Sequence, residues 1–269
     1  MKKRKLFNVH THLSNLDSIP ARVKDWESLG CVKCCALAEE PDENKEILKW
    51  MKEFPDFIIG MGSVEIRDAV GVPDDVDRLK EQGFTGLKFI TPSHSYDDNR
   101  YMPLYERANQ LKMPVIFHTG YGSYPAAADM LKTVSSENVR PWKLDKIARA
   151  FPNLQIIGAH LGLPHANEAL SLMLKFSNIF YDMCGGSGKK THLSLIKKAM
   201  APFPGADMTN PEENLALQHF KKMMFSTDTA EISVWYPNSE EIMDYLQIPE
   251  ETRELFYWSN AAKMFGVED

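Results

Sequence analysis

The stretch LFNVHTHL, residues 6–13, decides how the rest of the chain is interpreted. Its apolar first half is typical of a buried strand, and the run ends in two histidines one residue apart. Because successive side chains of a strand point to opposite faces, we expect His10 and His12 to share a face. Two neutral imidazoles on one face at a strand end can bind a single divalent metal ion.

Further apolar runs of similar length alternate with helical patterns along the chain. Strongly apolar strands that alternate with helices indicate parallel pairing, with helices covering the sheet. Eight such units are the number that closes a (β/α)8 barrel, so we predict an α/β fold of the TIM-barrel type. The predicted strands are residues 6–10, 31–38, 57–64, 86–90, 114–118, 154–160, 179–184 and 222–228.

An open doubly wound sheet is the alternative to a barrel. The chain lacks the G-x-G-x-x-G and G-x-x-x-x-G-K-[ST] motifs that bind nucleotides in such sheets, and the barrel is favoured. No linker or repeat divides the chain, so we predict one domain over residues 1–269. We expect two long connections, 119–142 and 185–211, to wall the mouth of the barrel, the second with a short helix near 193–200.

Composition and charge exclude several classes of function. The net charge of -6 argues against nonspecific binding to nucleic acid. The chain has no apolar run of the roughly 18 residues that a membrane helix needs, and no apolar stretch typical of a signal peptide, so we expect a cytoplasmic protein. We interpret the four cysteines as buried, reduced thiols: Cys31, Cys34, Cys35 and Cys184.

Residues that can bind metal or substrate occupy equivalent places in several predicted strands. In a barrel the carboxyl ends of all strands converge on one mouth, where residues distant in sequence meet. Five residues of metal-binding types at the ends of four strands therefore predict a metal site, with a lysine beside it. These residues are His10 and His12 in the first strand, Lys88 in the fourth, His118 in the fifth, His160 in the sixth and Asp228 in the eighth.

Several motifs resemble those of the amidohydrolase superfamily, specifically its amidohydrolase-2 branch of metal-dependent hydrolases and non-oxidative decarboxylases. The matching segments are VHTHL, GLKFI, VIFHTG, FPNLQIIGAHLG, FSTD and SNAAKMFG, and they span nearly the whole chain. The resemblance implies that His10, His12, His118 and Asp228 bind a divalent metal, most often zinc. It also implies that His160 lies beside the attacking water or joins a second metal.

The residue chemistry agrees with this ligand set. Three imidazoles and one carboxylate suit Zn²⁺, with Mn²⁺, Fe²⁺ and Co²⁺ as alternatives. We expect one ion, while two remain conceivable. Asp228 can also accept a proton from the attacking water, and His160 can orient that water or shuttle its proton, so both are predicted catalytic residues.

Lys88 has three interpretations. It could hold a substrate carboxylate as a free ammonium, bridge two metals as a carboxylated lysine, or form a structural ion pair; the first is favoured. Tyr121, in the loop just after His118, is a second predicted substrate contact.

These residues predict a metal-dependent hydrolase that attacks a lactone, amide or ester carbonyl of a small, perhaps anionic molecule. The alternative is a non-oxidative decarboxylase of an aromatic or unsaturated carboxylic acid; many such enzymes have Glu at the position of His10, which leans towards hydrolysis. A third hypothesis is an inactive barrel kept as a binding protein. We expect a small-molecule substrate and no nucleic-acid or membrane partner. The family resemblance makes a homodimer plausible, and no sequence feature decides the oligomeric state.

Overall fold

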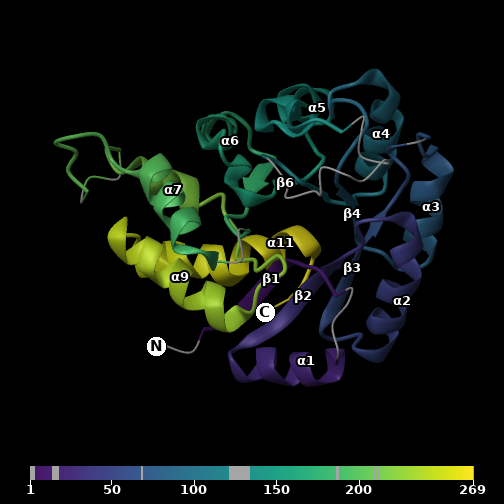
Figure 1. Ribbon diagram of the computed structural model, residues 1–269, viewed down its shortest axis with the longest axis horizontal. Helices are drawn as coiled ribbons and strands as arrows, with labels where there is room; N and C mark the ends of the chain where they lie inside the picture. Colours follow the sequence, from purple (N-terminus) through teal and green to yellow (C-terminus); the bar gives the residue numbers. More distant parts are fainter. Residues whose placement is uncertain are drawn as a thin grey trace.

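The strands form a single parallel sheet that curls into a barrel (Figure 1). The computed structural model describes residues 4–13, 18–67, 69–120, 134–185, 188–208, 210 and 212–268. Within these residues seven regular strands pair in sequence order. They are β1 Leu6–Thr11, β2 Cys31–Leu37, β3 Ile58–Ser63, β4 Gly86–Phe89, β5 Val115–Phe117, β6 Ile156–Gly158 and β7 Ile179–Tyr181.

The eighth predicted strand, residues 222–228, closes the barrel without forming a regular ladder. On one side of this segment lies Tyr181 at the end of β7. Its N–H donates to Lys222 O at 3.1 Å, and its carbonyl accepts from Met224 N at 3.0 Å. On the other side, Val9 N donates to Phe225 O at 3.0 Å and Asp228 N donates to His10 O at 2.8 Å. The segment therefore joins β7 to β1, and the predicted TIM barrel is confirmed.

Helices cover the outside of the sheet, as the alternating pattern predicts (Figure 1). The run PNSEEIMDYL, residues 237–246, predicts a helix that starts at Pro237. This prediction is wrong, because α9 begins at Ile232 and contains Pro237. The helices are α1 Ile19–Ser28, α2 Asn44–Glu53, α3 Pro73–Glu81, α4 Met102–Gln110, α5 Leu144–Ala150, α6 Ala166–Lys175, α7 Lys190–Met200, α8 Leu215–Phe220, α9 Ile232–Tyr245, α10 Glu250–Glu254 and α11 Asn260–Phe265, with a π-helical turn at Leu255–Ser259.

Two hydrophobic clusters make up the core. The larger lies between the strands and the surrounding helices. The smaller joins inward-facing strand residues such as Val9, Ile116 and Ile157 to Trp258 and Ala261 of the C-terminal helical segment. Because apolar side chains fill this part of the interior, the polar strand ends are left to form the mouth.

The β1–β2 pairing shifts register between Asn8 and Thr11, next to the two histidines. Such an irregularity re-aims side chains locally, and here Val9 packs in the inner cluster while His10 still reaches the mouth. All four cysteines are buried and free of disulfides, which confirms their interpretation. In the described ranges, none of the helices combines the length and apolar character needed to span a membrane.

Candidate metal centre

His10 and His12 converge at the end of β1. Their Nε2 atoms are 3.1 Å apart and their ring centroids 5.1 Å apart. His10 is fully buried and His12 is 7% exposed. The expected shared placement of the two rings is therefore present in the structure.

Asp228 completes a three-residue cluster with this pair. Its Oδ1 lies 3.4 Å from His12 Nε2 and 3.7 Å from His10 Nε2. The backbone is fixed to β1, because Asp228 N donates to His10 O and His12 N donates to Asp228 O at 3.3 Å. Asp228 also adopts a φ of 60°, an unusual conformation for a non-glycine residue that is typical of functional sites.

Asp182, just after β7, is a site residue that the sequence prediction missed. Its Oδ2 accepts from His10 Nδ1 at 2.9 Å, and its Oδ1 accepts from the backbone N of His160 at 2.8 Å. The thiol of Cys184 also donates to Oδ1, at 3.2 Å. The signal was present, because the run IFYD ends in aspartate just as FSTD does.

His160 sits on a left-handed turn directly after β6. Its φ is 64°, and Leu161 and Gly162 follow with φ of 50° and 61°. The ring Nδ1 donates to Cys184 O at 2.9 Å. Its centroid lies 5.1 Å from that of His10 and 4.9 Å from that of His118. The predicted ligand His118 therefore adjoins the cluster through His160, and its ring is not among the donor atoms that lie within 4.8 Å of one another in the described residues.

The absence of a side chain at Gly185 makes room for the ring of His160. A Cβ at this position would lie 2.9 Å from His160 Nδ1, and the φ of +114° also favours glycine. The segment after β7 therefore holds His160 through three features: the Asp182 carboxylate, the Cys184 carbonyl and the absent side chain of Gly185.

Lys88 of β4 is 1% exposed and lies under the histidines. Its Nζ donates to His10 Nε2 at 3.3 Å. Burial lowers the pKa of the ammonium, while the negative charges of Asp228 and Asp182 oppose this shift. The predicted contact residue Tyr121 lies outside the described residues.

The electrostatics keep His10 and His118 neutral and the Asp228 carboxylate ionised. Burial, together with the charge of Lys88, lowers the pKa of His10 to about 3, and burial lowers the pKa of His118 well below its ordinary value. Burial alone would raise the pKa of Asp228, but the neighbouring histidines His12, His160 and His10 bring it below its usual range. These are the protonation states in which such side chains bind metals.

The donor set fits a divalent cation. The Asp182 carboxylate can only accept, so the His10 proton lies on Nδ1 and Nε2 presents a lone pair. The Glu39 carboxylate oxygen Oε1 lies 3.3 Å from His12 Nδ1. The contact does not have hydrogen-bond geometry, but the negative charge favours a proton on Nδ1 and a lone pair on Nε2. Two imidazole lone pairs and a carboxylate oxygen then point at one another, an arrangement that a cation between them would stabilise.

A second group of donor atoms within 4.8 Å of one another comprises His10, His160, Asp182 and Cys184. Burial raises the pKa of the Cys184 thiol well above its ordinary value, and the thiol donates to Asp182. Because metals bind thiolates rather than thiols, we interpret this group as hydrogen-bonded support behind the first cluster.

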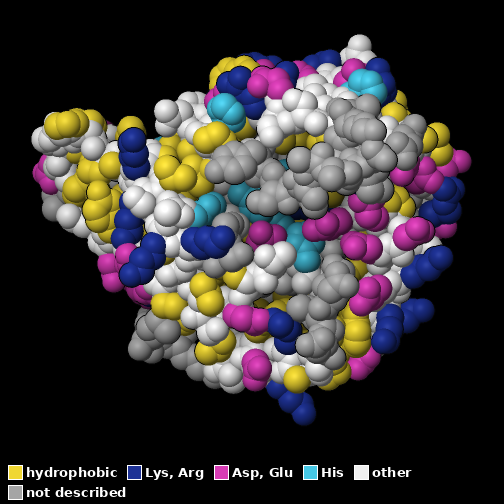
Figure 2. Space-filling model, viewed as in Figure 1, with side chains coloured by type: hydrophobic (Ala, Val, Ile, Leu, Met, Phe, Trp, Pro, Cys, Tyr) yellow, Lys and Arg dark blue, Asp and Glu magenta, His cyan; other side chains and the backbone are white. Residues whose placement is uncertain are grey.

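The surface around the cluster is divided by charge. Histidine side chains gather near the middle of the face in Figure 2, with Asp and Glu side chains mainly on one side and Lys or Arg on the other. Glu39, which follows β2, lies against His12 and is a further acidic group that the sequence prediction did not select.

Comparison with known proteins places this cluster in a family. A sequence profile of the amidohydrolase family matches residues 35–267. The chain belongs to the amidohydrolase family. It is thus an enzyme of the amidohydrolase superfamily, in the amidohydrolase-2 branch that its motifs resemble. None of the curated protein sequences compared with this amidohydrolase matches it.

Solved structures share the amidohydrolase barrel at low sequence identity. An uncharacterised TIM-barrel protein from Bordetella bronchiseptica has a TM-score of 0.68 at 15% identity, covering 98% of this chain and 99% of that one. A probable 2-pyrone-4,6-dicarboxylic acid hydrolase from Acinetobacter baumannii, with citric acid bound, has a TM-score of 0.64 at 11% identity, covering 98% and 100%. A 5-carboxyvanillate decarboxylase from Novosphingobium aromaticivorans, complexed with manganese, has a TM-score of 0.59 at 17% identity, covering 91% and 79%.

Proposed function

We propose that this amidohydrolase is a metal-dependent hydrolase of a lactone, amide or ester in a small, anionic molecule. The observation that carries the proposal is the convergence of His10 Nε2, His12 Nε2 and Asp228 Oδ1 at 3.1–3.7 Å, at the mouth of a barrel. In the proposed reaction, water attacks the carbonyl carbon of the substrate.

His10, His12, His118 and Asp228 would hold the ion, with His160 beside it. Zn²⁺ suits this donor set, with Mn²⁺, Fe²⁺ and Co²⁺ as alternatives and one ion favoured. When bound, such an ion supplies Lewis acidity that polarises the carbonyl and lowers the pKa of water.

The side chains around the ion would handle the proton. The carboxylate of Asp228, which the neighbouring histidines keep ionised, would accept the proton of the attacking water. His160 has its Nδ1–H engaged by Cys184 O, which leaves Nε2 as the nitrogen that can orient the water. Lys88 places a positive charge under the site, where it would attract an anionic group of the substrate.

A non-oxidative decarboxylase is the second candidate. The manganese-bound decarboxylase among the similar structures favours it, and the same ligands could hold the oxygens of a carboxylic acid. The presence of His10 where many decarboxylases of this branch have Glu favours hydrolysis. Motifs and fold are shared by both reactions, so the choice rests on an assay.

Two measurements test the proposal. Elemental analysis of the purified protein should show about one equivalent of a divalent metal, and removal by a chelator should abolish activity that added Zn²⁺ or Mn²⁺ restores. A panel of anionic lactones, amides and esters should then yield acid, and a panel of carboxylic acids should yield no carbon dioxide. Release of carbon dioxide would establish the second candidate. A protein that binds neither Zn²⁺ nor Mn²⁺ would support the hypothesis of an inactive barrel.

A further inference from the structure

A groove of about 980 Å³ runs between α7 and α9, on the outside of the barrel. Its lining residues recur at intervals of three and four along each helix, so one face of each helix is turned to the groove. The apolar part of the lining comes from Leu193 and Ala201 on the α7 side and from Val234, Pro237 and Tyr245 on α9.

This side of the molecule exposes an unusual share of apolar side chains. Among the described residues, five of the nine exposed large hydrophobic side chains lie between α7 and α9 in the sequence: Leu195, Phe203, Leu215, Val234 and Tyr245. Hydrophobic side chains are correspondingly gathered on the part that projects to the left in Figure 2. An exposed apolar patch of this kind marks an interaction surface more often than a solvated one.

The groove is positively charged along α7. This helix carries Lys190, Lys197 and Lys198 and no acidic residue. Lys197 pairs with Glu241 of α9 at 2.5 Å, whereas Lys190 and Lys198 have no ion-pair partner in the part of the chain that the structure describes. The groove therefore favours an occupant that is both apolar and acidic.

The chain itself carries a segment of that character. After α7, the described residues 201–208, 210, 212 and 213 belong to an arm that extends away from the barrel (Figure 1). The arm begins with Ala201-Pro202-Phe203-Pro204, and Phe203 is 51% exposed. Its charged residues are Asp207, Glu212 and Glu213, with no Lys or Arg. Prolines on both sides restrict the backbone of Phe203, which lowers the entropy lost when the arm docks.

We propose that two copies of this chain form a two-fold dimer in which each arm lies in the α7–α9 groove of the other copy. Phe203 would cover Val234 and Tyr245, and the acidic end of the arm would approach Lys190 and Lys198. A two-fold axis uses the same arm and the same groove on both subunits, so the contact closes on itself.

The dimer would bear on the metal centre through the elements that form the groove. Helix α7 follows the segment that holds Asp182 and Cys184, and α9 follows Asp228. Packing of a partner against both helices restrains the two connections that carry these residues. Subunit mass is measured without metal or substrate, so this proposal and the proposed reaction can fail independently.

Light scattering coupled to gel filtration tests the dimer. The full-length protein should have twice the 30.6-kDa mass of the chain and dissociate on dilution. Phe203→Ser in the arm, and Lys190→Glu with Lys198→Glu in the groove, should each raise the dimer dissociation constant at least about 100-fold, because each change occurs twice in the interface.

Mixing the two variants is the sharper experiment. Each variant alone has no intact arm–groove contact in its dimer. A mixture can form one intact contact, between the unchanged arm of the lysine variant and the unchanged groove of the Phe203 variant. Mixing should therefore restore a measurable dimer that neither variant forms alone.

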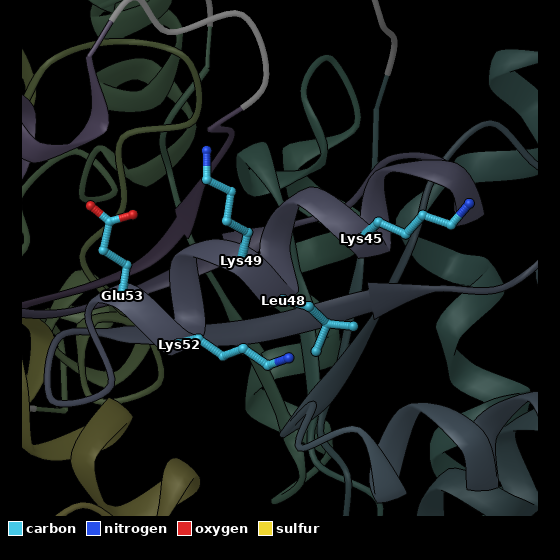
Figure 3. A pocket seen from close by; sticks show the side chains of 5 residues that line it. All are labelled: Lys45, Leu48, Lys49, Lys52 and Glu53. Atoms are coloured by element: carbon cyan, nitrogen blue, oxygen red, sulfur yellow. The ribbon is translucent and has the colours of Figure 1, made fainter.

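Matched controls lie elsewhere on the surface. Leu174, which is 54% exposed, serves as the control for Phe203 in a Leu174→Ser variant. Lys45 and Lys52 project from the outer face of α2 (Figure 3) and serve as the control pair for charge reversal. Both controls should leave the dimer intact. A monomer at all concentrations, a mass that keeps rising through open chains, or equal effects of test and control variants would each overturn the proposal.

Discussion

The carboxylate of Asp182 accepts the Nδ1–H of His10 at 2.9 Å, across 172 positions of sequence. Both side chains are fully buried. Burial alone would raise the pKa of Asp182, yet His10 and His160 lower it, so the group remains an acceptor. This contact fixes the His10 tautomer that presents Nε2 to the mouth.

Asp182→Asn should weaken metal binding by about 10–100-fold while the fold survives. An amide NH₂ turned to His10 Nδ1 would move the ring proton to Nε2 and remove the lone pair that the metal needs. Titration of Zn²⁺ against a chromophoric chelator measures the loss. Asp145→Asn, on an exposed ion pair of α5, is the control. Equal affinity in the two variants would show that Asp182 has no part in holding the metal.

Asp228→Asn should lower turnover by about 10²–10⁴-fold, because the amide cannot take a proton from water. The fold should persist, since the backbone bonds of Asp228 to His10 and His12 do not involve its carboxylate. Kinetics at saturating metal separate the loss of a base from the loss of a ligand. Full activity under those conditions would remove Asp228 from the proposed reaction.

The barrel was predictable because each strand carries its own apolar signal. Seven runs became regular strands, and the eighth was located correctly although it pairs through isolated bridges. The start of α9 was not predictable from Pro237, because a helix can begin upstream of a proline when the preceding turns pack against the barrel. Buried Ile232 and Trp235 supply that packing.

The sequence predicted which residues gather at the candidate site, but not the hydrogen bonds of Asp182 that hold them. His10, His12, His118, His160, Lys88 and Asp228 meet at one mouth, and their roles towards metal and substrate stay predictions. Asp182 was overlooked although it ends a strand. Its choice of His10 as partner depends on closure of the barrel, which brings β7 and β1 together through residues 222–228, and no local pattern encodes that pairing.

Lys88→Met should change activity and stability in opposite directions. Methionine has a side chain of similar length to lysine but carries no charge. Replacing the buried ammonium in this way should raise the free energy of unfolding by about 1 kcal/mol or more. The same change should lower kcat/KM for an anionic substrate about 100-fold, because its charge partner is lost. Urea unfolding and kinetics on matched anionic and neutral substrates provide the readouts. An equal loss on the neutral substrate would show that Lys88 acts on His10 rather than on substrate charge.

Gly120→Ala should separate the two segments that carry His118 and His160. A Cβ here would lie 2.0 Å from the backbone oxygen of Leu163, and φ is +92°. We expect a loss of at least about 2 kcal/mol in the free energy of unfolding, together with reduced activity. Gly266→Ala is the control, because its φ is +66° with no atom within 4 Å of a Cβ. A loss no larger than that of the control would mean that the clash relaxes freely.

His219, in α8, should make the protein sensitive to mild acid. It is 5% exposed, and neither ring nitrogen has a hydrogen-bond partner among the residues described. Burial lowers its pKa from 6.5 to about 4. Between these values the unfolded chain binds a proton that the folded chain does not, so its contribution to stability is present above pH 6.5 and is lost as the pH falls towards 4.

His219→Leu should remove this dependence. Wild-type protein should lose about 2 kcal/mol more than the variant when urea unfolding is compared at about pH 7.5 and about pH 5. Titration of the other histidines is common to both proteins and cancels in the comparison. At the higher pH the variant should be at least as stable as wild type, because a buried, unsatisfied polar group has been removed. Parallel pH profiles for the two proteins would show that His219 becomes protonated in the folded state without cost.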